Sequence, residues 1–304
     1  MFKNKKLLRI IGLIFIFLAF FFLIKTFLKT WKEVDWSTME IKYEFFFPAI
    51  FFNFLQFLIS TLLWYFCYLH ILNIKIKFKE LLAINTISQI TKYIPGKIWS
   101  PASAVILTTK LGVPIEQSIS AQVFLTFLYI FSSSILSLIP ILIFFSKTNL
   151  FLLALIISLI CFITLHPSIF NKIINLISLK LRKKTINVNF SYKDILYLFF
   201  LFILSLFFHN LSCFIMLKAF FWNLIKFKQI WIFIGINTAA LLIGFISLLP
   251  GGLGVRESIT FLGLKSLFPT SIAVLMSLLI RLWVIGYISL FFFIFGLKFL
   301  KKYL

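Results

Sequence analysis

The stretch 248–258, LLPGGLGVRES, interrupts a long apolar segment between two runs that are typical of lipid-embedded helices. Pro250 lacks a backbone N–H, so a helical hydrogen bond is lost at this point. Three glycines nearby accept backbone angles closed to other residues, namely Gly251, Gly252 and Gly254. Irregular backbone at membrane depth is tolerated only where protein covers it or where it lines a watery cavity. The motif therefore predicts a broken helix that faces a polar cavity, with an ordinary interfacial turn as the alternative.

Two ionisable residues, Arg256 and Glu257, follow the break at the start of a new helical segment, where exposed amides favour an anion. Arg281 lies near the middle of the last apolar run. Each ionisable group at the bilayer centre costs on the order of 3 kcal/mol, so such residues are functional candidates. We expect Arg256, Glu257 and Arg281 to meet in one site. That site is either a basic pocket for a lipid phosphate or a structural ion pair that holds the hairpin to the last helix.

The composition is that of an integral membrane protein. Of the 304 residues, 62% are hydrophobic and 12% are charged, and the mean hydropathy is +1.10. The net charge of +22 does not indicate nucleic-acid binding, because the basic residues are scattered between apolar runs, where they orient helices. The cysteines lie far apart without a CxxC pair or a nearby His, so neither a metal site nor a cofactor is expected. They are Cys67, Cys161 and Cys213.

Apolar runs predict an all-α, polytopic protein with about six full crossings, since roughly 20 apolar residues span the hydrocarbon. The runs cover residues 10–24, 45–69, 118–145, 150–165, 194–220 and 270–297. Basic residues concentrate on the segments that this count places inside, above all in a predicted loop over 166–193. We therefore expect a multi-pass protein of the cytoplasmic membrane with both termini in the cytoplasm.

A first broken hairpin is predicted between the second and third crossings. Residues 81–94 are only modestly apolar, run into Pro95, Gly96 and Lys97, and are followed by a short arm over 98–109. Both arms are too short to cross comfortably, so a re-entrant hairpin fits best. Its basic candidates are Lys92 and Lys97, which either join the polar site or extend to the interface.

The second hairpin consists of residues 230–249, the opening motif, and a short return arm over 256–268, although 230–249 are long enough to cross fully. Each hairpin approaches its break through Ile-Asn-Thr, at 84–86 and 236–238. We interpret 1–304 as one transmembrane domain, with no soluble catalytic domain, made of inverted halves 1–147 and 148–304. Paired interrupted segments of this kind indicate a transporter site near the midplane.

The two break motifs together carry a family resemblance. KYIPGKIWSP at 92–101, followed by LLPGGLGVRES, resembles the flippase-like transmembrane domain of lysylphosphatidylglycerol synthases over essentially the whole chain. The resemblance implies movement of a headgroup-modified lipid between leaflets, and the synthase activity, which belongs to a separate soluble domain, is not implied. Relatives tend to have an arginine shortly after the first break, where this chain has Ala102 and Ser103, so the headgroup of the cargo stays open.

We therefore expect no enzyme but a flippase-like protein that translocates an anionic or headgroup-modified lipid. Anionic phospholipids and polyprenyl-phosphate-linked lipids are the expected cargo classes, with a separate lipid-modifying enzyme or glycosyltransferase as a partner. One alternative is a non-catalytic membrane partner of cell-envelope lipid or glycan assembly, which needs no cavity. The other is a membrane-embedded transferase, which needs paired acids for metal or acid–base work, whereas the eight acids here are mostly dispersed. His209 beside Asn210 is more typical of a local hydrogen bond than of a proton shuttle.

Overall fold

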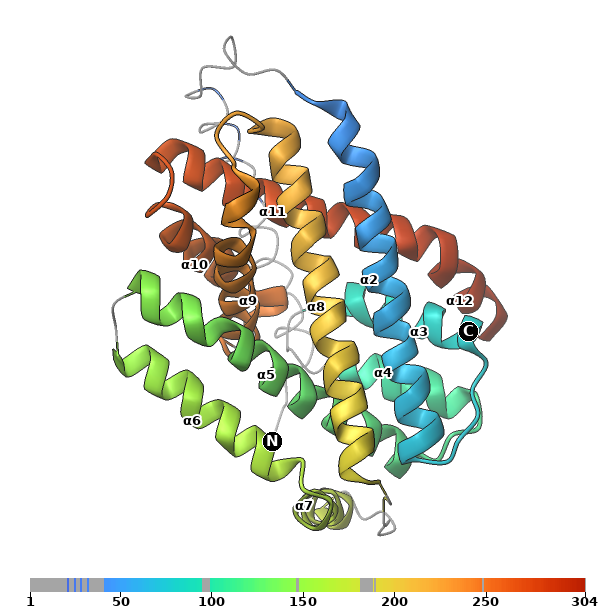
Figure 1. Cartoon of the computed structure of the whole chain (residues 1–304). Helices are drawn as coiled ribbons and strands as arrows, with labels where there is room; N and C mark the ends of the chain where they lie inside the picture. The colour runs from blue at the N-terminus through green and yellow to red at the C-terminus, as the bar shows by residue number, and fades with distance from the viewer. Residues whose placement is uncertain are drawn as a thin grey trace, which may run out of the picture.

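The computed structural model describes residues 41–94, 99–145, 148–180, 188, 190–247 and 249–303, together with Phe21, Lys25, Leu28 and Lys32. Within these residues all regular structure is helical (Figure 1). The predicted first crossing at 10–24, apart from Phe21, lies outside the described part, as do Pro95, Gly96 and Lys97 of the first break.

The helices follow the predicted order. Those before residue 147 are α2 (Phe46–Phe66), η3 (Cys67–Ile71), α3 (Phe78–Thr91), α4 (Trp99–Lys110) and α5 (Ile115–Phe145). Those after it are α6 (Thr148–Thr164), α7 (Pro167–Lys180), α8 (Tyr192–Phe220), α9 (Ile230–Ile246), α10 (Val255–Leu264), α11 (Thr270–Phe291), η6 (Phe292–Gly296) and α12 (Leu297–Tyr303). Short 3-10 turns occupy Tyr43–Phe45 (η2), Phe227–Gln229 (η4) and Pro250–Gly252 (η5).

Five helical segments in the described part are long and apolar enough to cross a membrane, which confirms the prediction of a polytopic, all-α membrane protein. They are Tyr43–Ile71, Ile115–Leu138, Tyr192–Phe220, Phe227–Ile246 and Thr270–Lys302. Four of them coincide with predicted crossings. The remaining one contains α9, which was predicted as the first arm of the second hairpin and whose length also permits a full crossing.

The predicted fourth crossing at 150–165 corresponds to α6, whose 17 residues rise about 25 Å against a hydrocarbon thickness of about 30 Å. The bent pair Leu155–Thr164 and Pro167–Ile177 is a sixth candidate span of the described part if it is counted as one span. The prediction of a loop over 166–193 was wrong for Pro167–Lys180, which form α7 at 83° to α6. This segment is helical because Phe170 and Ile174, one turn apart, are both buried, while Lys172 on another face is exposed.

Both predicted helix–break–helix hairpins are present. The α3 and α4 helices pack against each other around the first break, and α9 and α10 do so around the second. The chain reverses at the second break, since a Cβ atom added to Gly263 of α10 would lie 2.5 Å from Cγ2 of Ile236, near the start of α9. With ten residues, α10 extends only about 15 Å and does not cross.

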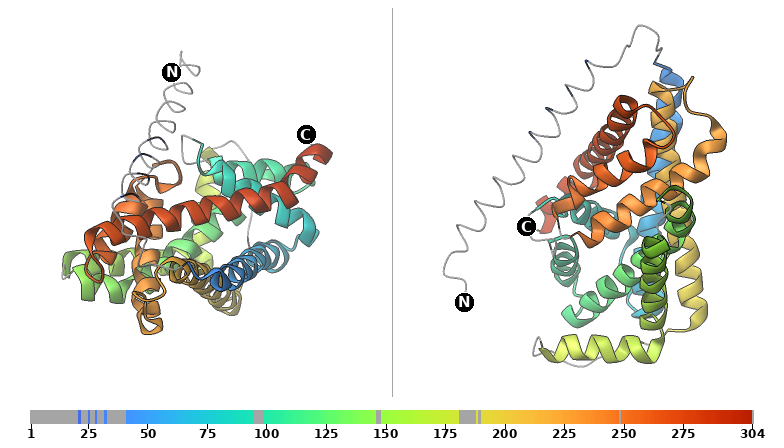
Figure 2. Two further views of the ribbon diagram at one scale, coloured as in Figure 1. Left: turned by 90° about the horizontal axis from the view of Figure 1, so that it is seen from above. Right: turned by 90° about the vertical axis from the view of Figure 1, so that its left-hand side faces the viewer.

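The hairpins are held between longer helices. The α2 and α8 helices pack along each other on one side of the molecule, and α11 lies on the other (Figure 2). The α9 helix packs on α5, while α3 packs on η6 at the end of the last crossing. Buried apolar side chains of α2, α8 and α11 form one large core cluster, which fixes the frame around the two breaks.

The two Ile-Asn-Thr triplets make similar contacts. Asn85 of α3 donates to Ser60 Oγ of the preceding crossing α2 at 2.7 Å, and Asn237 of α9 donates to Asn210 Oδ1 of the preceding crossing α8 at 2.8 Å. The threonine of each triplet donates to the carbonyl oxygen four residues earlier. An inverted relation between halves 1–147 and 148–304 stays a prediction, which these contacts favour.

Candidate functional site

The second break has the backbone that its glycines predict. Gly251, Gly252 and Gly254 have φ angles of 57°, 70° and 81°, in the left-handed region where a side chain is strained. The last of them precedes Val255, the first residue of α10. Pro250 is buried at the start of the 3-10 turn. The break is therefore an ordered turn inside the protein.

The two breaks contact each other through their main chains. The Gly251 N–H donates to the carbonyl oxygen of Lys92 at 2.8 Å, which joins the second break to the first. Tyr93 packs against the same glycine so closely that a Cβ atom at Gly251 would lie 2.7 Å from the tyrosine ring. Two backbone groups freed by broken helices thus satisfy each other inside the membrane protein.

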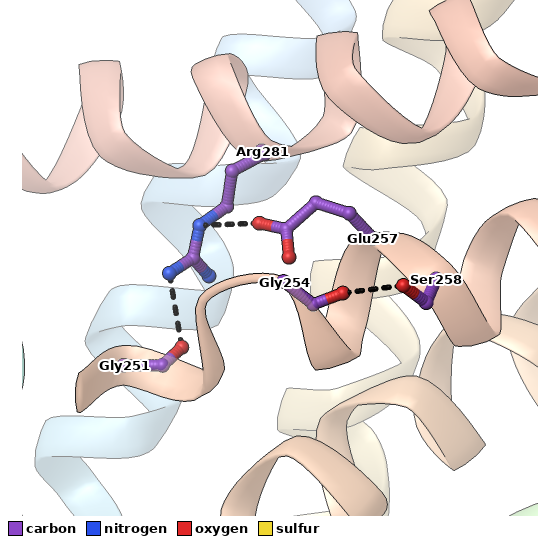
Figure 3. A network of polar contacts seen from close by, with 5 residues as sticks. All are labelled: Gly251, Gly254, Glu257, Ser258 and Arg281. Carbon is purple, nitrogen blue, oxygen red and sulfur yellow. Dashed lines mark hydrogen bonds and ion pairs between the residues drawn. The ribbon is translucent and has the colours of Figure 1, made fainter. Parts of the chain in front are cut away.

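Arg281 ties these parts to the last crossing (Figure 3). Its Nη2 donates to the Gly251 carbonyl oxygen at 2.9 Å, and its Nε forms an ion pair with Glu257 Oε1 at 3.1 Å. The guanidinium carbon also lies 5.1 Å from the centre of the Tyr93 ring. The Arg281 and Glu257 side chains are only 5% and 8% exposed. This buried pair links α11, α10 and both breaks.

A cavity of about 470 Å³ lies beside the breaks and is lined by residues from both hairpins and from α2, α5, α8 and α11. Lys92 of the first hairpin and Arg256 of the second both line it, together with Gln56, Gln89 and Gln122. None of its described lining residues is an Asp or a Glu. The cavity therefore combines two basic groups with neutral hydrogen-bonding groups.

Neither basic group has an acidic partner among the described residues. Lys92 Nζ donates to the neutral Gln89 Oε1 at 2.8 Å and lies 5.4 Å from the centre of the Tyr93 ring. The Arg256 side chain makes no hydrogen bond or ion pair within the described part of the chain, and its Nε is buried without a partner. Glycine makes room for its stem, because Cβ atoms at Gly244 or Gly252 would collide with it. The cavity therefore brings two basic side chains together without an acid among its described lining residues.

The structure separates the predicted site residues into two groups. Arg256, Glu257 and Arg281 all line a small space of about 20 Å³ between the second hairpin and α11. Of these, only Arg256 also lines the large cavity, which it shares with Lys92. His209 lines both spaces, with its Nδ1 3.4 Å from the Tyr287 hydroxyl. The polar lining was missed in the sequence, although glutamines inside apolar runs, such as Gln56, are an available signal.

One prediction isolates the contact between the breaks. Gly251→Ala introduces strain at a positive φ and also a collision with Tyr93, whereas Gly254→Ala introduces only strain, because no atom lies within 4 Å of its added Cβ. Strain of this kind costs about 1–2 kcal/mol. We expect Gly251→Ala to lower the thermal unfolding midpoint of the detergent-purified protein clearly more than Gly254→Ala does. Equal shifts would show that the contact between the breaks adds no stability.

The family comparison covers most of the chain. The family model described as the lysylphosphatidylglycerol synthase TM region matches residues 9–291, which include both breaks, Arg256, Glu257 and Arg281. No curated protein matches the chain.

Proposed function

Since this chain belongs to the family of the lysylphosphatidylglycerol synthase TM region, we propose that it moves, or helps to move, an anionic or headgroup-modified lipid across the bacterial cytoplasmic membrane. The observation that carries the proposal is the pair of basic side chains, Lys92 and Arg256, in a cavity whose described lining contains no acid. Two charges of one sign at membrane depth are costly, and a bound phosphate offsets that cost.

The chemistry of the cavity fits a phosphate-containing headgroup. Arginine presents a planar fork that binds two oxygens of a phosphate, and lysine adds a compact charge from the opposite hairpin. Three glutamines and the break backbone supply neutral hydrogen-bonding groups, as a hydrated path for a headgroup requires.

A non-catalytic assembly partner is the second candidate, and the buried Arg281–Glu257 pair is the observation that favours it. Such a pair often serves architecture alone. A purely structural role, however, explains the placement of Arg281 and Glu257 and leaves the unpaired Arg256 in the cavity without a purpose. A partner such as a lipid-modifying enzyme or glycosyltransferase is compatible with either candidate.

The proposal is tested by reconstitution into liposomes that contain labelled lipids of several headgroups. We expect exchange between leaflets above that of empty vesicles, with labelled phosphatidylglycerol moving faster than phosphatidylcholine. Protein heated to unfolding before reconstitution is the control. Exchange no faster than in empty vesicles, with protein shown to be folded, would reject translocation and favour the assembly partner.

Topology gives a separate prediction. The basic residues of the chain favour both termini in the cytoplasm, with α9 and α10 forming a hairpin that enters and leaves on one side. A reporter enzyme that functions only in the cytoplasm should therefore be active when fused after Leu304, and one that functions only outside should be silent. The opposite pattern would mean that α9 crosses fully, and it would remove the inverted relation between the halves.

A further inference from the structure

A second hollow lies between α2, α8 and α11. Its volume is about 350 Å³, and its lining is almost entirely apolar. Ile50, Leu282 and Leu290 line it and are themselves 45–49% exposed, so the groove opens towards the surroundings of the protein. A groove of this character between membrane-spanning helices suits an acyl chain.

One polar residue in the groove wall lacks a partner. Asn53 of α2 is 1% exposed, and neither its Nδ2 nor its Oδ1 has a hydrogen-bond partner among the described residues. The amide nitrogens of Asn85, Asn210 and Asn237 all have acceptors. Buried polar groups are normally hydrogen-bonded, so the unpaired amide of Asn53 is available to a molecule held in the groove.

The groove adjoins the basic cavity. Tyr287 and Phe291 of α11 line both hollows, so the two hollows adjoin at these side chains. A molecule with a charged end in the cavity and an apolar chain in the groove would lie against these two side chains. A lipid has this shape, with an anionic headgroup joined to apolar chains.

We propose that the groove between α2 and α11 binds an acyl chain of an ester-linked glycerolipid, with Asn53 Nδ2 donating to an ester carbonyl while the headgroup occupies the cavity. This inference rests on the proposed function and narrows its cargo. A polyprenyl phosphate has no ester carbonyl and leaves Asn53 unpaired, whereas a phosphoglyceride satisfies it. Asn53 lies about 10 Å along α2 from Phe46, the first residue of that helix.

The groove can be filled from within. A Cβ atom at Gly286 of α11 meets no atom within 4 Å, and Gly286 lines the groove, so Gly286→Phe or the smaller Gly286→Leu places a side chain at the groove wall. The matched control is Leu204→Phe on α8, which enlarges an exposed apolar side chain that lines neither hollow.

Native mass spectrometry of delipidated protein, titrated with dioleoyl phosphatidylglycerol or with its dialkyl-ether analogue, tests the inference. We expect the wild type and Leu204→Phe to bind the ester lipid about 3- to 10-fold more tightly than the ether, and Asn53→Leu to bind both equally, since one neutral hydrogen bond is lost. Gly286→Phe and Gly286→Leu should bind both lipids at least about tenfold more weakly.

Unchanged binding by both Gly286 variants would overturn the groove, and so would an ester preference that persists in Asn53→Leu. The thermal unfolding midpoint of each variant identifies misfolded protein, and the second substitution at Gly286 keeps the test decisive. These binding results are independent of movement between leaflets. Ester-selective binding without lipid exchange in liposomes would uphold the groove proposal and reject translocation. Lipid exchange in liposomes without an ester preference in binding would uphold translocation and reject the groove proposal.

Discussion

Arg281→Met should lower the free energy of unfolding by about 3–5 kcal/mol, the largest loss we expect from any single change at this site. The substitution leaves the Glu257 carboxylate buried without its ion-pair partner and removes the hydrogen bond to the Gly251 carbonyl oxygen. Denaturant or thermal unfolding of the purified protein in detergent measures the effect.

The double variant Arg281→Met with Glu257→Gln is the control for this prediction. It removes the stranded charge, so it should be more stable than Arg281→Met alone. If the single variant matched the wild type in stability, Arg281 would not hold the two breaks to the last crossing. In that case its buried position would instead point to a direct role with the cargo.

Arg256→Gln should have the opposite profile, with little loss of stability and a large loss of function. The Arg256 side chain makes no hydrogen bond or ion pair with the described residues, so its removal strands no partner. Hydrogen bonds to a charged group contribute about 1.5–3 kcal/mol, which corresponds to roughly 10- to 100-fold weaker handling of an anionic lipid. The same liposome exchange assay measures this, with phosphatidylcholine exchange as the internal reference.

Two further variants define what Arg256 contributes. Arg256→Lys keeps the charge but loses the two-pronged geometry, so exchange of the anionic lipid should still fall. Lys265→Gln, at the end of the same hairpin, removes an exposed charge that does not line the cavity and should leave exchange unchanged. If Arg256→Gln retained full anionic-lipid exchange, the cavity would not recognise its cargo through this residue.

Much of the fold could be predicted from local features of the sequence. The glycines after Pro250 predicted a break because glycine adopts positive φ angles that strain other residues. The structure has a positive φ at Gly251, Gly252 and Gly254. The loop prediction at α7 was wrong because lysines obscured the one-turn spacing of Phe170 and Ile174. The length of α9 permits both a full crossing and the first arm of a hairpin, so length does not distinguish these two roles.

The candidate site was predictable in residue type but not in arrangement. A buried arginine needs a partner, so the pairing of Arg281 with Glu257 follows from intramembrane charge alone. The bond from Gly251 to Lys92 joins segments far apart in the chain, and no local pattern encodes it. Sequence also gave Arg256 and Arg281 the same role, because only packing directs one of them into the large cavity.

The central claim is that the two helix breaks together build a site for the anionic group of a lipid. An electron cryo-microscopy map of the protein in nanodiscs of phosphatidylglycerol, compared with one in phosphatidylcholine, tests it most directly. The account predicts headgroup density in phosphatidylglycerol within hydrogen-bonding reach of Arg256 and Lys92, and weak or no density there in phosphatidylcholine. A cavity that is empty in both maps, or filled equally in both, would contradict it.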